Sequence, residues 1–395
     1  MIPLREPRGA DSKLSPDELR RYARHLSLPE VGTAGQAKLK AGRVLAVGAG
    51  GLGSPLALYL AAAGVGRIGL IDPDAVEASN LQRQVLYGTR DVGRPKVAAA
   101  AARLQEANPH VEVEAIPQRL TAANALAIVR EYDVVADGTD NFPSRYLVND
   151  ACVLAGKPNV WASVHRFEGQ ASVFWAARGP CYRCLHPEPP PEGAVPSCAE
   201  AGVLGVLPGL LGMVQAVETI KLLLGAGDPL VGRLLLFDAL AMRFREVRLR
   251  KNANCAVCGD RPTITKLTDV GIACEPERAS GMVSSGAMAG VAEISVEELQ
   301  AMRERGDPIV LLDVREPHEH AISDLPGSVK IPLGALASGY TKLSPDDAIV
   351  AYCRTGGRSA QAVAFLRQRG YAKARNLTGG INLWAERIDP TLARY

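Results

Sequence analysis

The sequence predicts an α/β protein in which a parallel sheet, covered by helices on both faces, is followed by a second and smaller α/β domain. Strand and helix patterns alternate over the first half of the chain, and this alternation is typical of such sheets. A glycine-rich turn follows the first buried strand. The length of 395 residues exceeds one core of ordinary size, so we expect at least two domains.

The elements of the first domain can be assigned in chain order. Ser15, Pro16 and Glu18 form a capping box with proline in the first turn, so a helix starts there. The expected strands are 43–47, 68–71, 111–116 and 133–136, and the expected helices are 55–63 and 97–106. Segments 166–175 and 234–237 are expected to add further strands, which could run antiparallel and make the sheet mixed.

Composition marks the boundary of the second domain. Residues 279–290 are rich in Ser, Gly and Ala with little periodicity, as in a linker. Ser295 and Glu298 form a second capping box, and 309–314 and 349–352 are apolar strands. The expected limits are 1–265 for the first domain, with a helical arm at 14–40, 266–290 for the linker and 291–395 for the second domain.

Charge and hydropathy argue against two classes of partner. The formal net charge is +3 and no run of Lys and Arg is present, so nucleic-acid binding has no support. The first residues contain no apolar signal-peptide core. The charge-free segment 201–217 contains Pro208 and four glycines and falls short of a membrane span of roughly 20 apolar residues, so we expect a buried pair of helices there. A soluble, cytoplasmic protein without a membrane partner is therefore expected.

The eight cysteines favour metal binding or catalysis over disulfides, because no export signal is present. Cys181 and Cys184 form one C-x-x-C pair, and Cys255 and Cys258 form another. Four thiolates are enough for a closed tetrahedral zinc site, which leaves no open position for a substrate. The sequence therefore predicts structural Zn²⁺, and two independent redox pairs or a chance pairing are the alternatives.

The glycine-rich segment 48–53 reads Gly-Ala-Gly-Gly-Leu-Gly and joins a strand to a helix. Glycines allow a tight turn and close backbone approach, and a helix N-terminus attracts phosphate, so a Rossmann-like nucleotide site is predicted. Asp72 ends the next strand, where a carboxylate can bind ribose hydroxyls. The loop alone does not separate ATP from a dinucleotide, and it could also be a turn that only connects two elements.

Polar and basic residues beyond Asp72 favour ATP. Segment 79–83 reads Ser-Asn-Leu-Gln-Arg, and Lys96 follows Pro95 at an expected helix start. Arg83 and Lys96 at the mouth of the crevice would offset the negative charge that grows during nucleotidyl transfer. Each could instead be a solvated surface charge. An NAD(P)-dependent oxidoreductase would gain little from either residue, so that alternative is disfavoured.

A second acidic loop, 137–141, reads Asp-Gly-Thr-Asp-Asn and ends another buried strand. It falls at the carboxyl edge of the expected sheet, where ligands bind. Asp140 could hold Mg²⁺, and Asn141 could hydrogen-bond the nucleotide. The alternative is that these residues only form a turn, for which their chemistry is equally suited.

Together these motifs resemble the molybdopterin-synthase adenylyltransferase family, whose members are relatives of the ubiquitin-activating enzymes. The resemblance covers 14–265 and rests on the two loops, Asp72, segment 79–84, Lys96 and the cysteine pairs, which occur in the family's order. It implies that ATP and its metal are bound by Gly51, Asp72, Ser79, Asn80, Leu81, Gln82, Arg83, Lys96, Asp140 and Asn141. It also implies that zinc is bound by Cys181, Cys184, Cys255 and Cys258.

Two further roles follow only from this resemblance. Arg24 matches a residue that reaches the ATP site of the partner subunit, which implies a homodimer with paired sites. Cys198, in a Ser-Cys-Ala-Glu segment, matches a cysteine that takes up the activated carboxylate. The alternative for Cys198 is a loop thiol without a role.

The second domain resembles a rhodanese-like domain. Segment 313–316 matches its early strand motif, 353–359 its active loop and 378–380 its closing motif. The loop reads Cys-Arg-Thr-Gly-Gly-Arg-Ser and precedes a helix, an environment that stabilises a thiolate or a persulfide on Cys353. The four residues between Cys353 and Arg358 are one fewer than in related phosphatase loops, which disfavours phosphate-ester chemistry. A vestigial docking domain is the alternative.

The fused arrangement is similar to that of the sulfurtransferases of molybdenum cofactor synthesis. It implies ATP-dependent adenylation of the C-terminal glycine of a ubiquitin-like sulfur carrier that ends in Gly-Gly, followed by sulfur transfer from a persulfide on Cys353 to give a thiocarboxylate. The small subunit of molybdopterin synthase is the leading carrier, and carriers for thiamin, tRNA thiolation or cysteine synthesis are alternatives. A cysteine desulfurase is the expected kind of persulfide donor. A non-catalytic scaffold is a further alternative.

Overall fold

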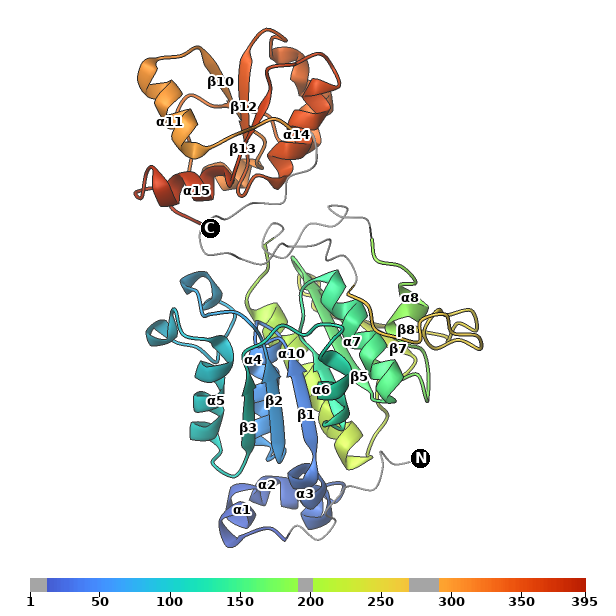
Figure 1. Ribbon diagram of the computed structural model, residues 1–395. Coiled ribbons are helices and arrows are strands. Elements are labelled where there is room, and N and C mark those ends of the chain that lie inside the picture. Colours follow the sequence, from blue (N-terminus) through green and yellow to red (C-terminus); the bar gives the residue numbers. More distant parts are fainter. Residues whose placement is uncertain (1–12, 191–201, 270–290) are drawn as a thin grey trace. The chain divides into compact units, whose positions relative to one another are not determined.

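The chain is built around two separate sheets, each in its own compact unit. The structure, a computed structural model, describes residues 13–190, 202–269 and 291–395. The chain divides into Met1–Glu275 and Pro276–Tyr395 (Figure 1). Each unit has its own hydrophobic core. The narrower domain limits of the sequence analysis remain predictions.

The first unit contains a mixed sheet of eight strands, which confirms the predicted fold class. Its strands are β1 (Arg43–Val47), β2 (Arg67–Ile71), β3 (Glu112–Ile116), β4 (Val134–Asp137), β5 (Asn159–His165), β6 (Glu168–Phe174), β7 (Arg233–Asp238) and β8 (Arg243–Arg248). The spatial order is β3-β2-β1-β4-β5-β6-β7-β8. The pairs from β3 to β5 are parallel, and the pairs from β5 to β8 are antiparallel.

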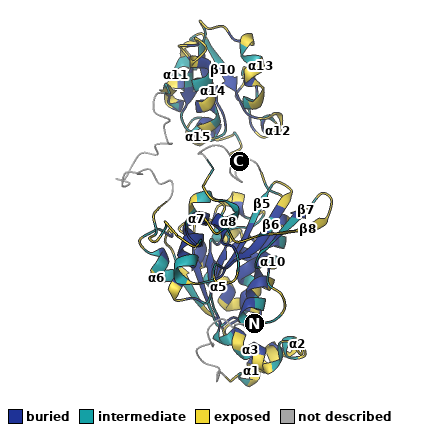
Figure 2. Ribbon diagram, turned by 90° about the vertical axis from the view of Figure 1, so that its right-hand side faces the viewer, coloured by how far each residue is buried: buried dark blue, intermediate teal, exposed yellow. Residues whose placement is uncertain are grey.

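Helices cover both faces of this sheet. They are α1 (Pro16–Arg21), α2 (Ala23–Leu26), α3 (Gly32–Ala41), α4 (Gly53–Ala62), α5 (Lys96–Ala107), α6 (Ala125–Arg130), α7 (Phe142–Ala155), α8 (Tyr182–Leu185) and α10 (Val206–Leu224). Alternate residues of β1 serve opposite faces: Val44 and Ala46 pack with residues of α4, α5 and α10, whereas Leu45 and Val47 pack with residues of α6 and α7. The central strands are therefore buried on both sides, as the burial colouring shows (Figure 2).

The register of the sheet brings three loops together. Val47 at the end of β1 pairs with Ile71 of β2 on one side and with Asp137 of β4 on the other. The chain segments that follow these three residues therefore leave the sheet at the same edge. They are the glycine-rich segment, the segment with Asp72 and the 137–141 loop.

The sequence prediction of a pair of helices over 201–217 is wrong, because the structure has one long helix there, α10. It is the one helix among the described residues whose length and composition would allow it to cross a membrane, and half of its apolar window is buried inside the unit. It packs against α4, β5 and β6. We expected a pair of helices over 201–217, but the structure has a single helix that begins at Val206. Pro208 does not interrupt it, because proline is tolerated in the first turn, where its missing N–H would have no partner.

The second unit has a parallel five-stranded sheet with the order β11-β10-β12-β13-β9. Its strands are β9 (Glu293–Ile294), β10 (Ile309–Asp313), β11 (Val329–Lys330), β12 (Ala348–Tyr352) and β13 (Arg375–Leu377). Its helices are α11 (Val296–Arg305), α12 (Pro317–His320), α13 (Leu336–Gly339), α14 (Gly357–Arg367) and α15 (Gly380–Arg387). The capping boxes predicted at Ser15 and Ser295 are both present.

Candidate active sites and metal centre

A cleft of about 450 Å³ lies at the carboxyl edge of the first sheet. Most of its walls are formed by the three loops that leave β1, β2 and β4, and the first turn of α10 contributes Pro208. Among the predicted nucleotide-binding residues, those in its lining are Gly51, Asp72, Asn80, Arg83, Lys96, Asp140 and Asn141. Residues far apart in sequence thus form one polar crevice at the expected edge of the sheet.

The glycine-rich loop requires glycine at two positions for different reasons. Gly48 has φ 92°, a backbone conformation that other residues rarely adopt. A Cβ on Gly53 would lie 1.9 Å from the backbone oxygen of Gly48, so no side chain fits there. Tyr87 secures the loop, because its hydroxyl donates to the carbonyl oxygen of Ala49 at 2.8 Å. Helix α4 begins at this loop, which favours anionic groups in the adjoining cleft.

Asp72 connects the glycine-rich loop to the neighbouring loop. One of its oxygens accepts a hydrogen bond from the backbone N–H of Ala49 at 2.8 Å, and the other accepts from the N–H of Asp74 at 2.9 Å. Burial raises the pKa of the Asp72 carboxyl, although the Lys96 ammonium acts in the opposite direction. The Asp72 side chain therefore orders the cleft wall. Its carboxylate oxygens also line the cleft, where they can accept further hydrogen bonds from a ligand.

Two of the cations that line the cleft, Lys96 and Arg83, are those expected from the sequence. The Nζ atom of Lys96 lies 3.0 Å from Oδ2 of Asp74, and the Lys96 side chain is 8% exposed whereas that of Asp74 is 62% exposed. Arg83 donates from Nη1 to the backbone oxygen of Ser79 at 3.0 Å. Both cations are thus held by neighbouring groups in the cleft wall, where they can offset the charge of a polyanion.

The 137–141 loop is fixed by buried groups below it. Oδ1 of the fully buried Asp137 accepts hydrogen bonds from the backbone N–H and the hydroxyl of Thr139, and burial raises the pKa of this carboxyl. The buried Arg145 donates from Nε and Nη2 to the backbone oxygen of Thr139. Asn141 caps α7 by accepting the N–H of Ser144. Asp140 is exposed and lines the cleft, where its carboxylate is accessible to a cation.

Several predicted residues lie elsewhere. Ser79, Leu81 and Gln82 are outside the cleft lining: Ser79 hydrogen-bonds Glu77, Leu81 packs against the core and Gln82 is exposed. Arg24 is exposed on α2, and Cys198 lies outside the described residues. The roles that the sequence assigned to these five residues remain predictions.

The four cysteines of the two C-x-x-C pairs meet in one cluster, although 74 residues separate Cys181 from Cys255. All four sulfur atoms lie within 4.8 Å of one another, and the shortest separations are 3.4, 3.6 and 3.9 Å. A tetrahedral site with Zn–S bonds of about 2.3 Å needs S–S separations of about 3.8 Å. The cluster therefore fits a metal ion with four thiolate ligands.

The active loop of the second unit connects β12 to α14. Cys353 is buried, and its Sγ accepts hydrogen bonds from the N–H of Gly356 at 3.2 Å and the hydroxyl of Ser359 at 3.4 Å. Gly380 packs tightly beneath the loop, because a Cβ there would lie 2.4 Å from the backbone oxygen of Cys353. The loop thus surrounds the sulfur with donors, which suits an anionic sulfur species.

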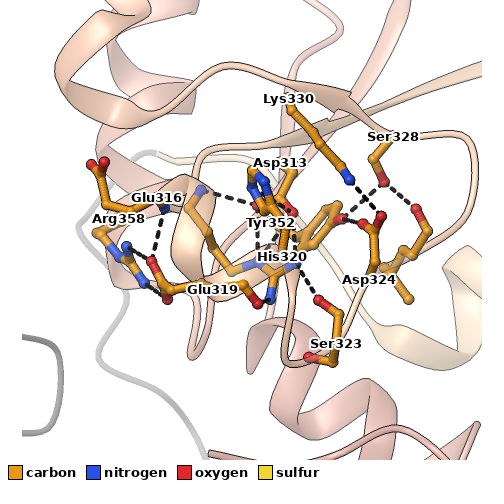
Figure 3. A network of polar contacts seen from close by, with 12 residues as sticks. Asp313, Glu316, Glu319, His320, Ser323, Asp324, Ser328, Lys330, Tyr352 and Arg358 are labelled. Atoms are coloured by element: carbon orange, nitrogen blue, oxygen red, sulfur yellow. Dashed lines mark hydrogen bonds and ion pairs between the residues drawn. The ribbon is translucent and has the colours of Figure 1, made fainter. Parts of the chain in front are cut away.

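A polar network supports this loop (Figure 3). Arg358 donates from both terminal nitrogens to Glu319 at 2.6 and 2.7 Å. In the same network the fully buried Arg315 and Asp313 form an ion pair, in which Nη2 lies 2.7 Å from Oδ2. The sequence motif at 313–316 is thus a structural support, and its link to the loop runs through Glu319, whose carbonyl oxygen accepts a hydrogen bond from Arg315.

Both units match known families. A sequence profile of the ThiF family matches residues 22–257, and one of the rhodanese-like domain matches residues 295–387. The chain belongs to the ThiF family. Its rhodanese-like domain follows the family's own domain, which confirms the resemblance seen in the sequence.

Known proteins match all or part of this chain. "Probable adenylyltransferase/sulfurtransferase MoeZ" of Mycobacterium tuberculosis is 46% identical over 401 residues, which cover 100% of this chain and 98% of MoeZ. "Sulfur carrier protein adenylyltransferase" of Thermus thermophilus is 57% identical over 263 residues, covering 65% of this chain and 97% of that protein. A crystal structure of E. coli MccB with AMPCPP and MccA is 25% identical, with a TM-score of 0.54, and covers 60% of this chain and 74% of MccB. This member of the family is thus an enzyme, an adenylyltransferase and sulfurtransferase.

The sequence analysis missed some residues of both sites. Asp74, Gln84 and Arg119 also line the cleft, and the buried Oε1 of Gln84 has no hydrogen-bond partner among the described residues. Gln84 is the last residue of the 79–84 segment on which the family resemblance rests, although the sequence analysis assigned it no role. Glu319 and Tyr395, which contact the arginines of the second site, are marked by no sequence pattern that we recognised.

Proposed function

We propose that this chain uses ATP to adenylate the C-terminal glycine of a ubiquitin-like sulfur carrier and then delivers sulfur to it from Cys353. The observation that carries the proposal is that the cleft gathers a glycine-rich loop, the cations Arg83 and Lys96, and Asp140 in a chain that also holds an intact rhodanese-like loop. The names of the relatives, MoeZ and a sulfur carrier protein adenylyltransferase, support this combination. The small subunit of molybdopterin synthase is our leading carrier.

The first step requires positioning and charge stabilisation more than acid–base chemistry. The carrier's carboxylate attacks the α-phosphorus of ATP, and pyrophosphate leaves. Arg83 and Lys96 would offset the negative charge that accumulates, and the N-terminus of α4 would favour the phosphates. Asp140 is our candidate ligand for Mg²⁺, which would neutralise charge on the phosphates. The product is an acyl-adenylate, a mixed anhydride that thiols attack readily.

An exposed apolar surface could receive the folded part of the carrier. Phe167, Leu204, Leu240 and Met242 are large hydrophobic residues that are exposed at one end of the sheet. This surface adjoins the cleft, because the N–H of Leu204 bonds to the oxygen of Arg166, while the preceding Val203 lines the cleft. A carrier docked here would direct its Gly-Gly tail towards the nucleotide.

The second step uses the active loop. Cys198 is our candidate to take up the activated carboxyl group as a thioester, with loss of AMP. The outer sulfur of a persulfide on Cys353 would then attack the acyl carbon and displace the Cys198 thiolate. A further thiol would cleave the S–S bond and release the thiocarboxylate. The resulting disulfide would require an external thiol for reduction. A cysteine desulfurase is the kind of donor that could reload Cys353.

Three further features belong to the proposal. The Cys181, Cys184, Cys255 and Cys258 cluster would hold structural Zn²⁺, because its four thiolates leave no open position. Two copies would form a homodimer in which Arg24 of each copy reaches the other's cleft. The enzyme would work in the cytoplasm.

Two variants of the full chain test the division of labour. With ATP, Mg²⁺ and a Gly-Gly-ended carrier, D140A should lose ATP–pyrophosphate exchange and keep thiosulfate:cyanide sulfurtransfer. C353A should show the reverse pattern. Undiminished ATP–pyrophosphate exchange in D140A would show that Asp140 is not a required Mg²⁺ ligand. Loss of both activities in C353A would contradict the proposal that the two units carry out separate steps. Calorimetry with ATP and NAD tests the oxidoreductase alternative.

A further inference from the structure

The last described residues of the first unit lie against a loop of the nucleotide cleft. The Ile264 side chain packs against the cysteine cluster that is our candidate zinc site. Leu267 packs against the core that contains residues of α6 and α7. Oδ1 of Asp269 accepts a hydrogen bond from the backbone N–H of Ala122 at 2.8 Å. The 264–269 segment therefore connects the cysteine cluster to the loop that follows β3.

The loop after β3 contributes residues 118–120 to the lining of the cleft. One of them, Leu120, is buried in the core against which Leu267 packs. The 264–269 segment thus supports this part of the cleft wall by packing as well as by the hydrogen bond of Asp269.

Ala122 and the cleft-lining Arg119 belong to one turn. Nδ2 of Asn124 donates to the backbone oxygen of Arg119 at 3.0 Å, and its Oδ1 accepts from the N–H of Thr121 at 2.8 Å. The bond from Ala122 to Asp269 therefore restrains a turn whose first residue lies in the cleft wall.

The order of the strands indicates which part of a nucleotide this loop would contact. In a sheet of this kind the phosphates lie at the loop after the first strand, and the acid at the end of the second strand binds the ribose. Strand β3 pairs with β2 on the side opposite to β1, so residues 118–120 lie beyond Asp72. This is the end of the cleft where the base of a bound nucleotide would lie.

We propose that the 264–269 segment positions residues 118–120 for binding the base of ATP, with Asp269 as the positioning residue. The inference rests on the proposed function of the cleft as the ATP site. Asp269 itself lies outside the cleft lining, so it acts through the N–H of Ala122 and not on the nucleotide. The segment therefore sets how tightly ATP is held and leaves the chemistry at the α-phosphorus to other residues.

Substitutions of Asp269 in the full chain test this role. D269A removes the acceptor, whereas D269N retains an oxygen that can accept from the N–H of Ala122. Since one hydrogen bond of this kind is lost, we expect D269A to raise the calorimetric Kd for ATP about two- to tenfold and D269N to raise it less. The kcat of ATP–pyrophosphate exchange at saturating ATP should change little. Kd for AMP should rise by the same factor as Kd for ATP, because AMP carries the same base.

The matched control is D238A. Oδ1 of Asp238 also accepts a hydrogen bond from a backbone N–H, that of Ala241 at 3.0 Å, and both aspartates are exposed. Because Asp238 lies outside the cleft lining, D238A should leave Kd for ATP and for AMP unchanged. Hydrogen exchange adds a readout of the loop itself. Without nucleotide, a peptide that contains 118–124 should exchange faster in D269A than in the wild type, and at the wild-type rate in D238A.

Two outcomes overturn the proposal. Equal Kd values for ATP in D269A and D238A would leave Asp269 without a role in nucleotide binding. A Kd that rises in D269A for ATP but not for AMP would place the effect at the phosphates and not at the base. Failure of the underlying function is distinguishable, because a wild-type chain that binds no ATP would overturn the ATP site itself.

Discussion

Replacing Glu319 by glutamine should destabilise the rhodanese-like unit strongly at neutral pH. The side chain of Glu319 is only 6% exposed and binds both terminal nitrogens of Arg358. Burial alone would raise the pKa of this carboxyl, but the hydrogen bonds from Arg358 and from the N–H of Glu316 prevail and lower its pKa from 4.5 to about 2. This difference corresponds to about 3 kcal/mol in favour of the charged, folded form.

The sign of the pH dependence follows from the depressed pKa. Because the carboxyl has a lower pKa in the folded state than in the unfolded state, its stabilisation is fully present above about pH 5 and is lost as the pH falls towards about 2. We expect E319Q to lower the free energy of unfolding by about 3 kcal/mol at pH 7 and by about half as much at pH 3. Removal of one partner of a buried ion pair costs about 3–5 kcal/mol, which agrees with this estimate.

Hydrogen exchange in a denaturant series can measure this loss in the full chain. Peptides from β12 and α14 report the unfolding of the second unit separately from the first. The matched control is E386Q, because Glu386 and Arg394 form an ion pair in the same unit with both side chains 57% exposed. It should change the free energy of unfolding by less than about 1 kcal/mol. A loss below about 1 kcal/mol for E319Q at pH 7, or one that does not shrink at pH 3, would refute the reasoning.

Three other predictions concern the first unit. G53A should weaken ATP binding at least about tenfold in calorimetry, because its new Cβ would lie 1.9 Å from a backbone oxygen of the glycine-rich loop. The control is G209A, which has open space around its Cβ and should bind ATP normally. K96Q should reduce pyrophosphate exchange at least about tenfold. It should change the free energy of unfolding by less than about 1 kcal/mol, because its partner Asp74 is 62% exposed and stays solvated. A large fall in the free energy of unfolding would contradict this prediction. C258S should lose bound zinc in metal analysis and lower the melting temperature of the first unit, and an unchanged melting temperature would exclude a structural metal.

Patterns carried by residues close in sequence were predictable. The strand at 43–47 was expected within its observed limits, and Ser15 and Ser295 form the capping boxes that their spacing indicates. The parallel core could be inferred because its buried strands are continuous apolar runs. Strand β8 was not predicted, since all six of its residues are exposed and such an edge strand has no hydrophobic signature.

The sequence by itself determined the fold class, the order of the motifs and some of the residues that line the cleft, among them Asp72, Lys96 and Asp140. Tertiary structure alone decided which groups meet around the sulfur: Glu319 pairs with Arg358 across 39 residues, and Tyr395 contacts Arg315 across 80. The physical reason is the distance along the sequence over which each interaction acts. Propensity, capping and glycine conformation depend on neighbours within a few residues, whereas an ion pair or an aromatic contact between distant residues exists only after the sheet and helices have packed.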